Sequence, residues 1–219
     1  MRTNPLNNLI VIEGLDGTGK ATQSKMLAEH LRASLFSFPN YNSKSSALVE
    51  MYLNGEFGKN AASINPYQAS AMFAVDRLGT YLKEMKTILE RAGKIVADRY
   101  TTSNILYQTA KFDSVEEKND FIKWVRRFEY KDLQLPEPTQ TFMLNVPFET
   151  FVDMMTLRND NKHDGEDIHE ADMDYLKKVY ENAQYVAEKL HWDIIECVDE
   201  NGNLLSRREI NRRIVKKLW

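Results

Sequence analysis

Short apolar runs alternate along this chain with longer stretches in which apolar residues recur every three or four positions. Runs of the first kind are typical of buried strands, and the second pattern is typical of helices that bury one face. Strands that alternate with helices predict an α/β fold, a five-stranded parallel sheet flanked by helices. The predicted strands span residues 9–12, 34–38, 94–98, 140–145 and 192–198.

The predicted helices begin at capping residues. Asn65 and Pro66 are typical of an N-cap and a first turn, so a long helix is expected from Pro66 to Gly93. Its predicted core stripe is Ala71, Ala74, Leu78, Tyr81, Leu82, Met85 and Leu89. Capping boxes predict two more helix starts, at Ser114 with Glu117 and at Ser206 with Glu209. Further helices are expected over residues 45–54, 100–110, 148–157 and 176–190.

A glycine-rich turn separates the first predicted strand from an amphipathic helix. Gly14, Gly19 and Lys20 have the spacing of the phosphate-binding loop (P-loop), whose successive N–H groups and helix N-terminus face an anion. The loop predicts a nucleotide site on a three-layer sandwich of the kind found in P-loop nucleotide hydrolases. The predicted ATP-binding residues are Gly14, Leu15, Asp16, Gly17, Thr18, Gly19, Lys20, Ala21 and Thr22.

The metal-binding position of this loop departs from the usual pattern. Ala21 follows Lys20, where a serine or threonine usually holds Mg²⁺. Thr22 lies one residue later, and the Asp16 carboxylate inside the loop offers a second oxygen ligand. We therefore expect Asp16 and Thr22 to hold Mg²⁺.

Composition excludes several classes of protein. The chain has 219 residues, which suits one domain spanning 1–219, and its net charge of −3 argues against non-specific binding to nucleic acid. No apolar stretch approaches the ~20 residues of a membrane span, and the N-terminus lacks a signal-peptide core. The single cysteine, Cys197, lies in an apolar run and is expected to be buried rather than reactive. A reducing cytoplasm is the predicted location.

Arginines near the predicted strand ends suit phosphoryl transfer, which needs positive charge on the moving oxygens. Arg99 follows a strand directly. Arg77 lies one helical turn after Phe73, so the ring and the guanidinium share a face and could hold a base. Two alternatives remain open: core packing for Phe73, and a surface ion pair with Asp76 or Glu84 for Arg77. Asp98 could be a structural partner of Arg99.

Residues 158–170 form the most polar stretch of the chain. Two interpretations are equally favoured by its composition. It is either a solvated surface loop or a lid that closes over the nucleotide. Arg158 lies where this stretch leaves a predicted helix.

Six short segments, in a fixed order, carry a family resemblance. They are Glu13-Gly14-Leu15-Asp16-Gly17-Thr18-Gly19-Lys20-Ala21-Thr22-Gln23, Phe38-Pro39-Asn40-Tyr41, Phe73-Ala74-Val75-Asp76-Arg77, Asp98-Arg99-Tyr100-Thr101-Thr102-Ser103-Asn104, Tyr107-Gln108 and Asp167-Ile168-His169-Glu170. In these segments and their spacing the chain resembles the thymidylate (dTMP) kinase family from end to end. The resemblance implies a Mg²⁺-dependent kinase that converts ATP and dTMP to ADP and dTDP.

The resemblance also implies roles for individual residues. Phe73 would stack on thymine, Arg77 and Asn104 would hydrogen-bond its polar edge, and Tyr107 would crowd the 2′ position. Arg99 would bind the acceptor phosphate, near Phe38, Pro39 and Tyr41. The predicted dTMP-binding residues are Asp16, Phe38, Pro39, Tyr41, Phe73, Arg77, Arg99, Asn104, Tyr107 and Gln108. Glu170, with Asp167 at the base of the lid, would help Asp16 and Thr22 to hold Mg²⁺.

One position differs among family members. Some carry a basic residue in the phosphate loop after the Asp, and others carry it in the lid. Here the loop position is Gly17. The cation that clamps the transferring phosphoryl group is therefore expected in the lid, with Arg158 favoured over Lys162. The predicted catalytic residues are Lys20, Asp16, Arg99 and Arg158.

Base selectivity follows from the predicted contacts. Thymine and cytosine differ at N3 and at the 4-position, so the wrong base would leave a buried Asn104 unpaired at a cost of ~1–3 kcal/mol. The 5-methyl group of thymine adds only about 0.8 kcal/mol of burial. Strong rejection of dCMP and weaker rejection of dUMP are therefore expected.

Other functions fit the sequence less well. Another nucleoside-monophosphate or deoxynucleoside kinase of the same fold is one alternative. A GTPase switch is another, because Asn161-Lys162-His163-Asp164 fits NKxD and Asp76-Arg77-Leu78-Gly79 fits DxxG, although both are misplaced relative to the predicted strands. The family is usually homodimeric, and the long helix from Pro66 could supply that interface.

Overall fold

The computed structural model describes residues 8–58, 60, 63–159 and 173–218, and in it five parallel strands form one sheet. The strand order is β2-β3-β1-β4-β5. The strands are β1 (Leu9–Glu13), β2 (Ser34–Ser37), β3 (Ile95–Asp98), β4 (Gln140–Asn145) and β5 (Asp193–Glu196). Each predicted run matches one of these strands to within two residues at either end, which confirms the α/β fold.

The position of each strand in the sheet explains its pattern of buried and exposed residues. All residues of β1 and β3 are buried, and so is the interior of β4, because these strands have neighbours on both sides and helices on both faces. The edge strand β2 alternates between half-buried and exposed residues. The other edge strand, β5, ends at Glu196, two residues before the predicted end, although the Cys197 N–H still donates to the Asn145 carbonyl.

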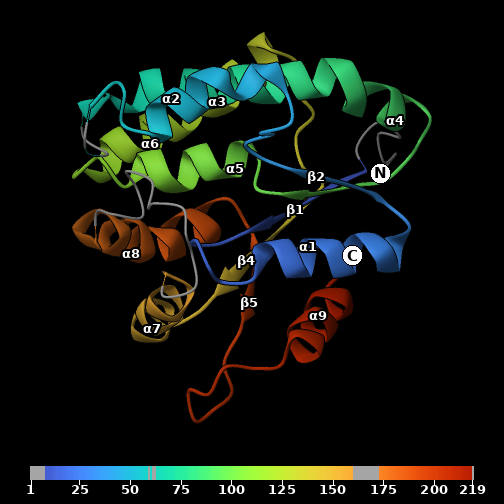
Figure 1. Cartoon of the computed structure of the whole chain (residues 1–219), viewed down its shortest axis with the longest axis vertical. Helices are drawn as coiled ribbons and strands as arrows, with labels where there is room; N and C mark the ends of the chain where they lie inside the picture. The colour runs from blue at the N-terminus through green and yellow to red at the C-terminus, as the bar shows by residue number, and fades with distance from the viewer. Residues whose placement is uncertain (1–7, 59, 61–62, 160–172, 219) are drawn as a thin grey trace.

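Helices cover both faces of the sheet (Figure 1). In that view α1 (Lys20–Leu31) lies below β1, at the level of β4, and α9 (Arg207–Lys216) lies to the right of β5. Above the strands lie α2 (Ala47–Leu53), α3 (Pro66–Thr80), α4 (Lys86–Glu90), α5 (Thr101–Ser103) and α6 (Val115–Arg126). The remaining helices are α7 (Phe148–Asn159) and α8 (Met173–Lys189). This arrangement is the predicted three-layer sandwich.

The predicted helix starts are correct where side chains cap them. Asn65 Oδ1 accepts from the Gln68 N–H, and both predicted capping boxes, at Ser114 and at Ser206, have their two reciprocal bonds. The predicted helix over residues 45–54 begins as a short 3-10 turn, η1 (Lys44–Ser46), and continues as α2. Local sequence therefore fixes where these helices begin.

Among the described residues, three helices contain π-helical segments that the sequence did not indicate: η3 (Tyr81–Met85), η4 (Asn104–Gln108) and η5 (Arg127–Asp132). A π turn changes the phase of a helix relative to a strict 3.6-residue period. Leu82 was predicted in the core stripe of the long helix, and that prediction is wrong, because it lies in η3 and its side chain is 59% exposed. Ala74, Met85 and Leu89 of the same stripe are buried as predicted.

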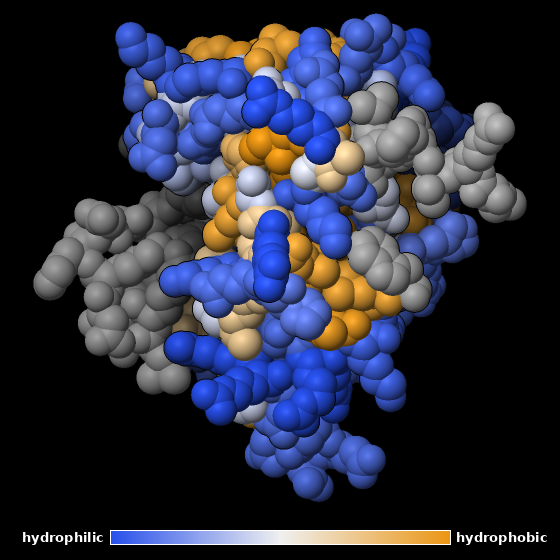
Figure 2. Space-filling view, turned by 90° about the vertical axis from the view of Figure 1, so that its right-hand side faces the viewer, coloured by the Kyte–Doolittle hydropathy of each residue, from blue (hydrophilic) through white to orange (hydrophobic). Residues whose placement is uncertain are grey.

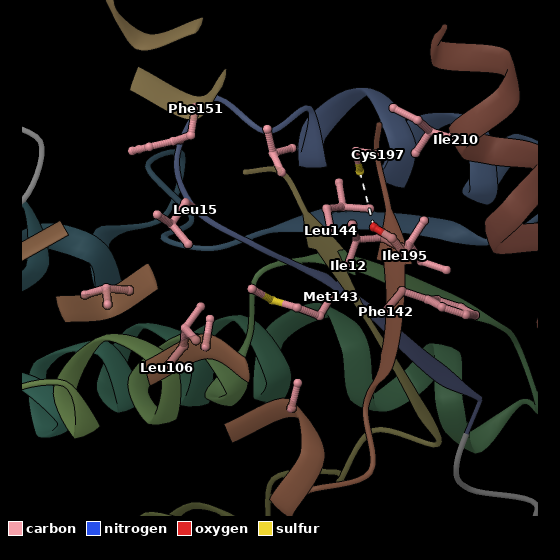
Figure 3. Close-up of a cluster of buried hydrophobic side chains, with 14 of the residues drawn as sticks. Ile12, Leu15, Leu106, Phe142, Met143, Leu144, Phe151, Ile195, Cys197 and Ile210 are labelled. Carbon is pink, nitrogen blue, oxygen red and sulfur yellow. Dashed lines mark hydrogen bonds between the residues drawn. The ribbon is translucent and has the colours of Figure 1, made fainter. Parts of the chain in front are cut away.

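The largest core cluster lies where β1, β4 and β5 meet the helices (Figure 3). Ile12, Phe142, Leu144 and Ile195 are buried together there. Cys197 is fully buried in this cluster, as predicted, with its Sγ 3.4 Å from the Ile195 carbonyl oxygen. Burial, with a further contribution from Glu196, raises the pKa of the Cys197 thiol to about 12, so it stays protonated and unreactive at neutral pH.

The face at the right of Figure 1 shows how these layers reach the surface. In Figure 2 hydrophobic residues gather in the centre of that face, and hydrophilic residues surround them. The hydrophobic middle layer therefore reaches the surface on this face, and further hydrophobic residues lie at its top edge. In the part of the chain that the structure describes, no helix is both long enough and apolar enough to cross a membrane.

Candidate active site

The loop between β1 and α1 has a backbone that its glycines alone can adopt. Gly14 has φ +150°, and a Cβ there would lie 3.1 Å from the Leu144 carbonyl oxygen and 2.9 Å from Thr18 Oγ1. Gly19, the N-cap of α1, has φ +92°. These conformations are open to glycine and strained for other residues. The loop thus brings its N–H groups and the start of α1 to the carboxyl end of β1.

Lys20 turns back over this loop from the first position of α1. Its Nζ donates to the Leu15 carbonyl oxygen at 2.6 Å and lies 3.9 Å from Asp16 Oδ1. Burial, with repulsion from nearby Arg99 acting in the same direction, lowers the pKa of the Lys20 ammonium to about 8. Lys20 is therefore a buried cation whose charge is only partly compensated and is available to an anion.

Arg99 and Asp16 form an ion pair at the centre of the site. Arg99 Nη2 donates to Asp16 Oδ1, the Tyr107 hydroxyl donates to Asp16 Oδ2 at 3.0 Å, and the Arg99 guanidinium lies over the Tyr107 ring at 5.2 Å. Burial alone would raise the pKa of the Asp16 carboxyl, but Arg99 and Lys20 hold it well below its usual range. Both members of the pair are thus charged.

The sequence places Arg99 beside the loop through backbone contacts. Arg99 follows the last residue of β3 and has φ +65°, and its N–H donates to the Ile12 carbonyl oxygen of β1 at 3.1 Å. This bond turns the chain at the carboxyl edge of the sheet. The Arg99 side chain then lies toward Asp16 and Ser103.

Two buried carboxylates next to the loop were not among the predicted site residues. Glu13 is fully buried and accepts from Thr102 Oγ1 at 2.8 Å and Ser103 Oγ at 2.7 Å. Asp98 ends β3, and its Oδ1 is buried and has no hydrogen-bond partner among the described residues. Burial raises the pKa of the Asp98 carboxyl. An acidic residue at the end of an apolar strand was the available signal for both.

A cavity of about 100 Å³ lies beside this ion pair. Its lining contains every residue predicted to bind dTMP: Asp16, Phe38, Pro39, Tyr41, Phe73, Arg77, Arg99, Asn104, Tyr107 and Gln108. Leu53, Tyr100 and Ser103 complete the wall and were not predicted. The structure therefore brings together side chains from five separate stretches of the chain in one place.

Phe73 belongs both to this cavity and to a small core cluster. Its ring packs edge-on against Tyr52 with the centroids 6.0 Å apart, and it contacts the cluster around Val49 and Ala69. The side chain is half-buried and also lines the cavity. Core packing and base contact are thus compatible at this position.

Arg77 is 2% exposed, so the alternative of a surface ion pair with Asp76 or Glu84 is wrong. Its Nε and Nη2 donate to the two oxygens of Glu129, each at 2.7 Å, although Arg77 and Glu129 are 52 positions apart in the sequence. Asp76 instead accepts from the Asn40 N–H and from Ser45 Oγ. Glu129 was missed because nothing local in the sequence links it to Arg77.

Other predicted residues do not line the cavity or lie outside the described residues. Thr22 is half-buried in the first turn of α1, and Ala21 beside it is exposed. The side chain of Arg158, at the end of α7, lies outside the described residues, as do Lys162, Asp167 and Glu170. The residues of the possible DxxG motif lie inside α3 rather than at a strand end, which removes that support for a GTPase switch.

Comparison with known proteins shows the family of the chain. The family model "Thymidylate kinase" matches residues 12–205 of the chain. A probable thymidylate kinase of Methanocaldococcus jannaschii is 31% identical over 195 residues, covering 89% of each chain. The thymidylate kinase of Plasmodium falciparum is 28% identical over 193 residues, covering 86% of this chain and 81% of the relative.

Solved structures share the fold. The thymidylate kinase of Candida albicans superposes with a TM-score of 0.70 at 21% identity, covering 96% of this chain and 90% of that chain. The thymidylate kinase of Ehrlichia chaffeensis gives 0.63 at 21% identity, with 97% and 99% covered. Because the family model spans most of the sequence, the chain belongs to the thymidylate kinase family.

Proposed function

We propose that this protein transfers the γ-phosphoryl group of ATP to dTMP and releases ADP and dTDP. One observation carries the proposal. A cavity lined by an aromatic ring, two arginines and an asparagine lies beside a phosphate-binding loop, and Asp16 belongs to both. Two nucleotides bound in these two places would meet at Asp16, Lys20 and Arg99. Phosphoryl transfer needs this head-to-head arrangement more than it needs a reactive side chain.

The loop would bind the phosphates of ATP. The N–H groups that follow Gly14 and the N-terminus of α1 present fixed dipoles, and Lys20 adds a buried positive charge. Lys20 would exchange its bond to the Leu15 carbonyl for one to the outer phosphates. These groups stabilise the charge that develops as the phosphoryl group moves.

The cavity would bind dTMP. Phe73 would stack on the base, and Tyr107 would crowd the 2′ position and favour deoxyribose. Arg99 would bind the acceptor phosphate, which is already ionised and needs no general base. At about 100 Å³ the cavity is smaller than the ~300–1,000 Å³ of most small-molecule pockets. Binding therefore requires its wall to move, and we expect the Arg99–Asp16 pair to open as Arg99 turns to the phosphate.

Mg²⁺ fits the residues at this edge of the sheet. The buried Asp98 Oδ1 lacks a hydrogen-bond partner among the described residues, and a hard cation prefers such a carboxylate oxygen. Asp16, Thr22 and Asp98 would hold the ion with Glu170, which lies outside the described residues. When bound, Mg²⁺ would supply positive charge to the β- and γ-phosphate oxygens.

Residues 158–170 would act as the lid, with Arg158 as its clamping cation. We also propose that the enzyme consists of one domain, is a homodimer and works in the cytoplasm. Exposed Tyr67 and Val75 on α3 and Leu82 on η3 support an interface on the long helix, since each is more than 40% exposed. The single buried cysteine suits a reducing compartment.

Turnover assays test the proposed function directly. ADP release would be measured with ATP, Mg²⁺ and each of dTMP, dUMP, dCMP, dGMP and thymidine. We expect dTMP to give the highest kcat/KM and dUMP the next. A higher kcat/KM for dGMP or for thymidine would favour one of the related kinases instead.

Replacing Phe73 with alanine is expected to raise the KM for dTMP about tenfold or more, because base–aromatic stacking is worth ~1–3 kcal/mol. The KM for ATP should change little, since Phe73 does not contact the loop. Steady-state kinetics with each substrate varied would show this. Phe148→Ala, a half-buried ring away from the cavity, is the matched control. An equal loss of affinity for dTMP and for ATP would show that Phe73 is only a core residue.

Replacing Arg158 with alanine is expected to lower kcat about 10²-fold or more while the KM for dTMP changes little, because a clamping cation acts in the transition state. Steady-state kinetics with saturating ATP would measure both constants. Lys162→Ala is the comparison. If Arg158→Ala leaves kcat unchanged and Lys162→Ala lowers it, the clamping role moves to Lys162.

A further inference from the structure

We infer that Glu129 sets the hydrogen-bonding polarity of the base-binding end of the cavity, so that it accepts the N3–H of thymine and rejects cytosine. Glu129 does not line the cavity, and it acts through two residues that do, Arg77 and Asn104. It is therefore a positioning residue. The inference rests on the proposed function, because it names the group that makes the site selective for thymine.

The Glu129 carboxylate is fully buried and accepts four hydrogen bonds. Oε2 accepts from Arg77 Nε at 2.7 Å and from Thr101 Oγ1 at 2.6 Å. Oε1 accepts from Arg77 Nη2 at 2.7 Å and from Asn104 Nδ2 at 2.8 Å. A buried carboxylate with this many donors holds each of them in one orientation.

Arg77 meets Glu129 with one edge of its guanidinium, formed by Nε and Nη2. Its Nη1 donates to the Tyr100 carbonyl oxygen at 3.4 Å, a long bond. One hydrogen on Nη1 and one on Nη2 remain. Because Arg77 lines the cavity, these two hydrogens are the donors it can offer to a base.

Asn104 has its amide orientation fixed by its neighbours. Both hydrogens of Nδ2 are used, one by the Ser70 carbonyl oxygen at 3.1 Å and one by Glu129 Oε1 at 2.8 Å. A flipped amide would set Oδ1 against two acceptors. Oδ1, which accepts no hydrogen bond from any described residue, is thus the polar atom that Asn104 can offer to the cavity. The network, not the asparagine alone, decides that this position is an acceptor.

This polarity matches thymine and opposes cytosine. Thymine carries a donor at N3 and an acceptor at the 4-position, which pair with Asn104 Oδ1 and with the Arg77 N–H groups. Cytosine carries the reverse, an acceptor at N3 and a donor at the 4-position. Bound cytosine would leave acceptors facing each other and donors facing each other in a buried place, which selects strongly against it. Uracil has the same edge as thymine, so this device does not exclude dUMP.

The test is Glu129→Gln, which keeps the size of the side chain and removes its charge. The introduced amide would have one acceptor oxygen, so its NH₂ group would face either Arg77 Nε or both Arg77 Nη2 and Asn104 Nδ2, and the network of four bonds could not be kept. The kcat/KM ratio of dTMP to dCMP should fall at least about tenfold, the scale set by one mispaired buried group. The loss should lie in the KM for dTMP, with the KM for ATP nearly unchanged.

Thr101→Val is the matched control, because Thr101 bonds Glu129 but does not line the cavity. Its thermal stability should fall while the dTMP:dCMP ratio stays at the wild-type value, which separates selectivity from packing. Glu129→Asp, which keeps the charge beside Arg77 but is one methylene shorter, is the second variant should Glu129→Gln not fold. It should give an intermediate ratio.

The outcomes separate this inference from the function beneath it. Wild-type enzyme that phosphorylates dTMP, with Glu129 variants that keep its dTMP:dCMP ratio, would overturn the inference alone. Equal loss of the ratio in Thr101→Val would also overturn it, since general disruption would then explain the effect. Wild-type enzyme without dTMP turnover would overturn the proposed function and this inference together.

Discussion

Replacing Arg99 with methionine is expected to lower kcat/KM for dTMP by at least about 10³-fold, the lower end of the effect of an arginine that stabilises charge in phosphoryl transfer. Arg99 pairs with Asp16 in the resting site and lies at the end of the cavity nearest the phosphate loop. Its loss would remove the positive charge that faces the acceptor phosphate. It would also leave the Asp16 carboxylate unpaired, so that this carboxylate would repel both substrates. Steady-state and single-turnover kinetics would measure the change.

Arg127→Met is the control for this substitution, because Arg127 is an exposed arginine that pairs with Asp132 at 3.6 Å. It should leave all kinetic constants within about twofold, as expected of an exposed ion pair. A loss of less than about tenfold in Arg99→Met would contradict the placing of Arg99 on the acceptor phosphate. The ion pair with Asp16 would then be structural.

The same Arg99→Met variant is expected to change the pH dependence of ATP use. In the wild-type site burial first, and then repulsion by Arg99, lower the pKa of Lys20 to about 8. Lys20 is charged below that pH and neutral above it, so kcat/KM for ATP should fall as pH rises past about 8. Without Arg99 the pKa rises and this alkaline limb moves to higher pH. A limb at the same pH in both proteins would show that Arg99 does not act on Lys20.

The features predicted correctly from sequence are those that a short stretch determines by itself. The phosphate loop is determined by Gly14, Gly19 and Lys20, which are close together in the sequence as well as in the structure. The capping boxes at Ser114 and Ser206 are likewise closed within four residues. Parallel order follows because each strand is followed by a helix that must return the chain to the same edge. These features therefore need no knowledge of distant partners.

The missed features depend on residues far apart in the chain. No pattern around residue 129 shows that Glu129 meets Arg77 and Asn104 behind the cavity wall. The π-helical segment Tyr81–Met85 likewise breaks the 3.6-residue period on which the position of Leu82 was predicted. The wall of the cavity was predicted through resemblance to a family, because periodicity alone would have assigned Phe73 to the core.

Substituting methionine for Arg77 is expected to lower the free energy of unfolding by about 3–5 kcal/mol, the cost of leaving one partner of a buried ion pair uncompensated. Arg77 is 2% exposed and Glu129 is fully buried, so water cannot replace the lost charge. Arg126→Met is the matched control, because Arg126 and Glu137 form an ion pair that is nearly half exposed. It should cost about 0–1 kcal/mol. Urea denaturation of the three proteins would give these values.

The double variant Arg77→Met, Glu129→Gln separates the cost of the stranded charge from the value of the ion pair. Removing both charges leaves no buried ion without its partner, so the double variant should be more stable than Arg77→Met alone. It should still bind dTMP poorly, because methionine supplies none of the donors that we propose for Arg77 toward the base, whereas ATP affinity should stay near the wild-type value. A double variant no more stable than Arg77→Met would mean that the uncompensated Glu129 charge is not what destabilises the single variant.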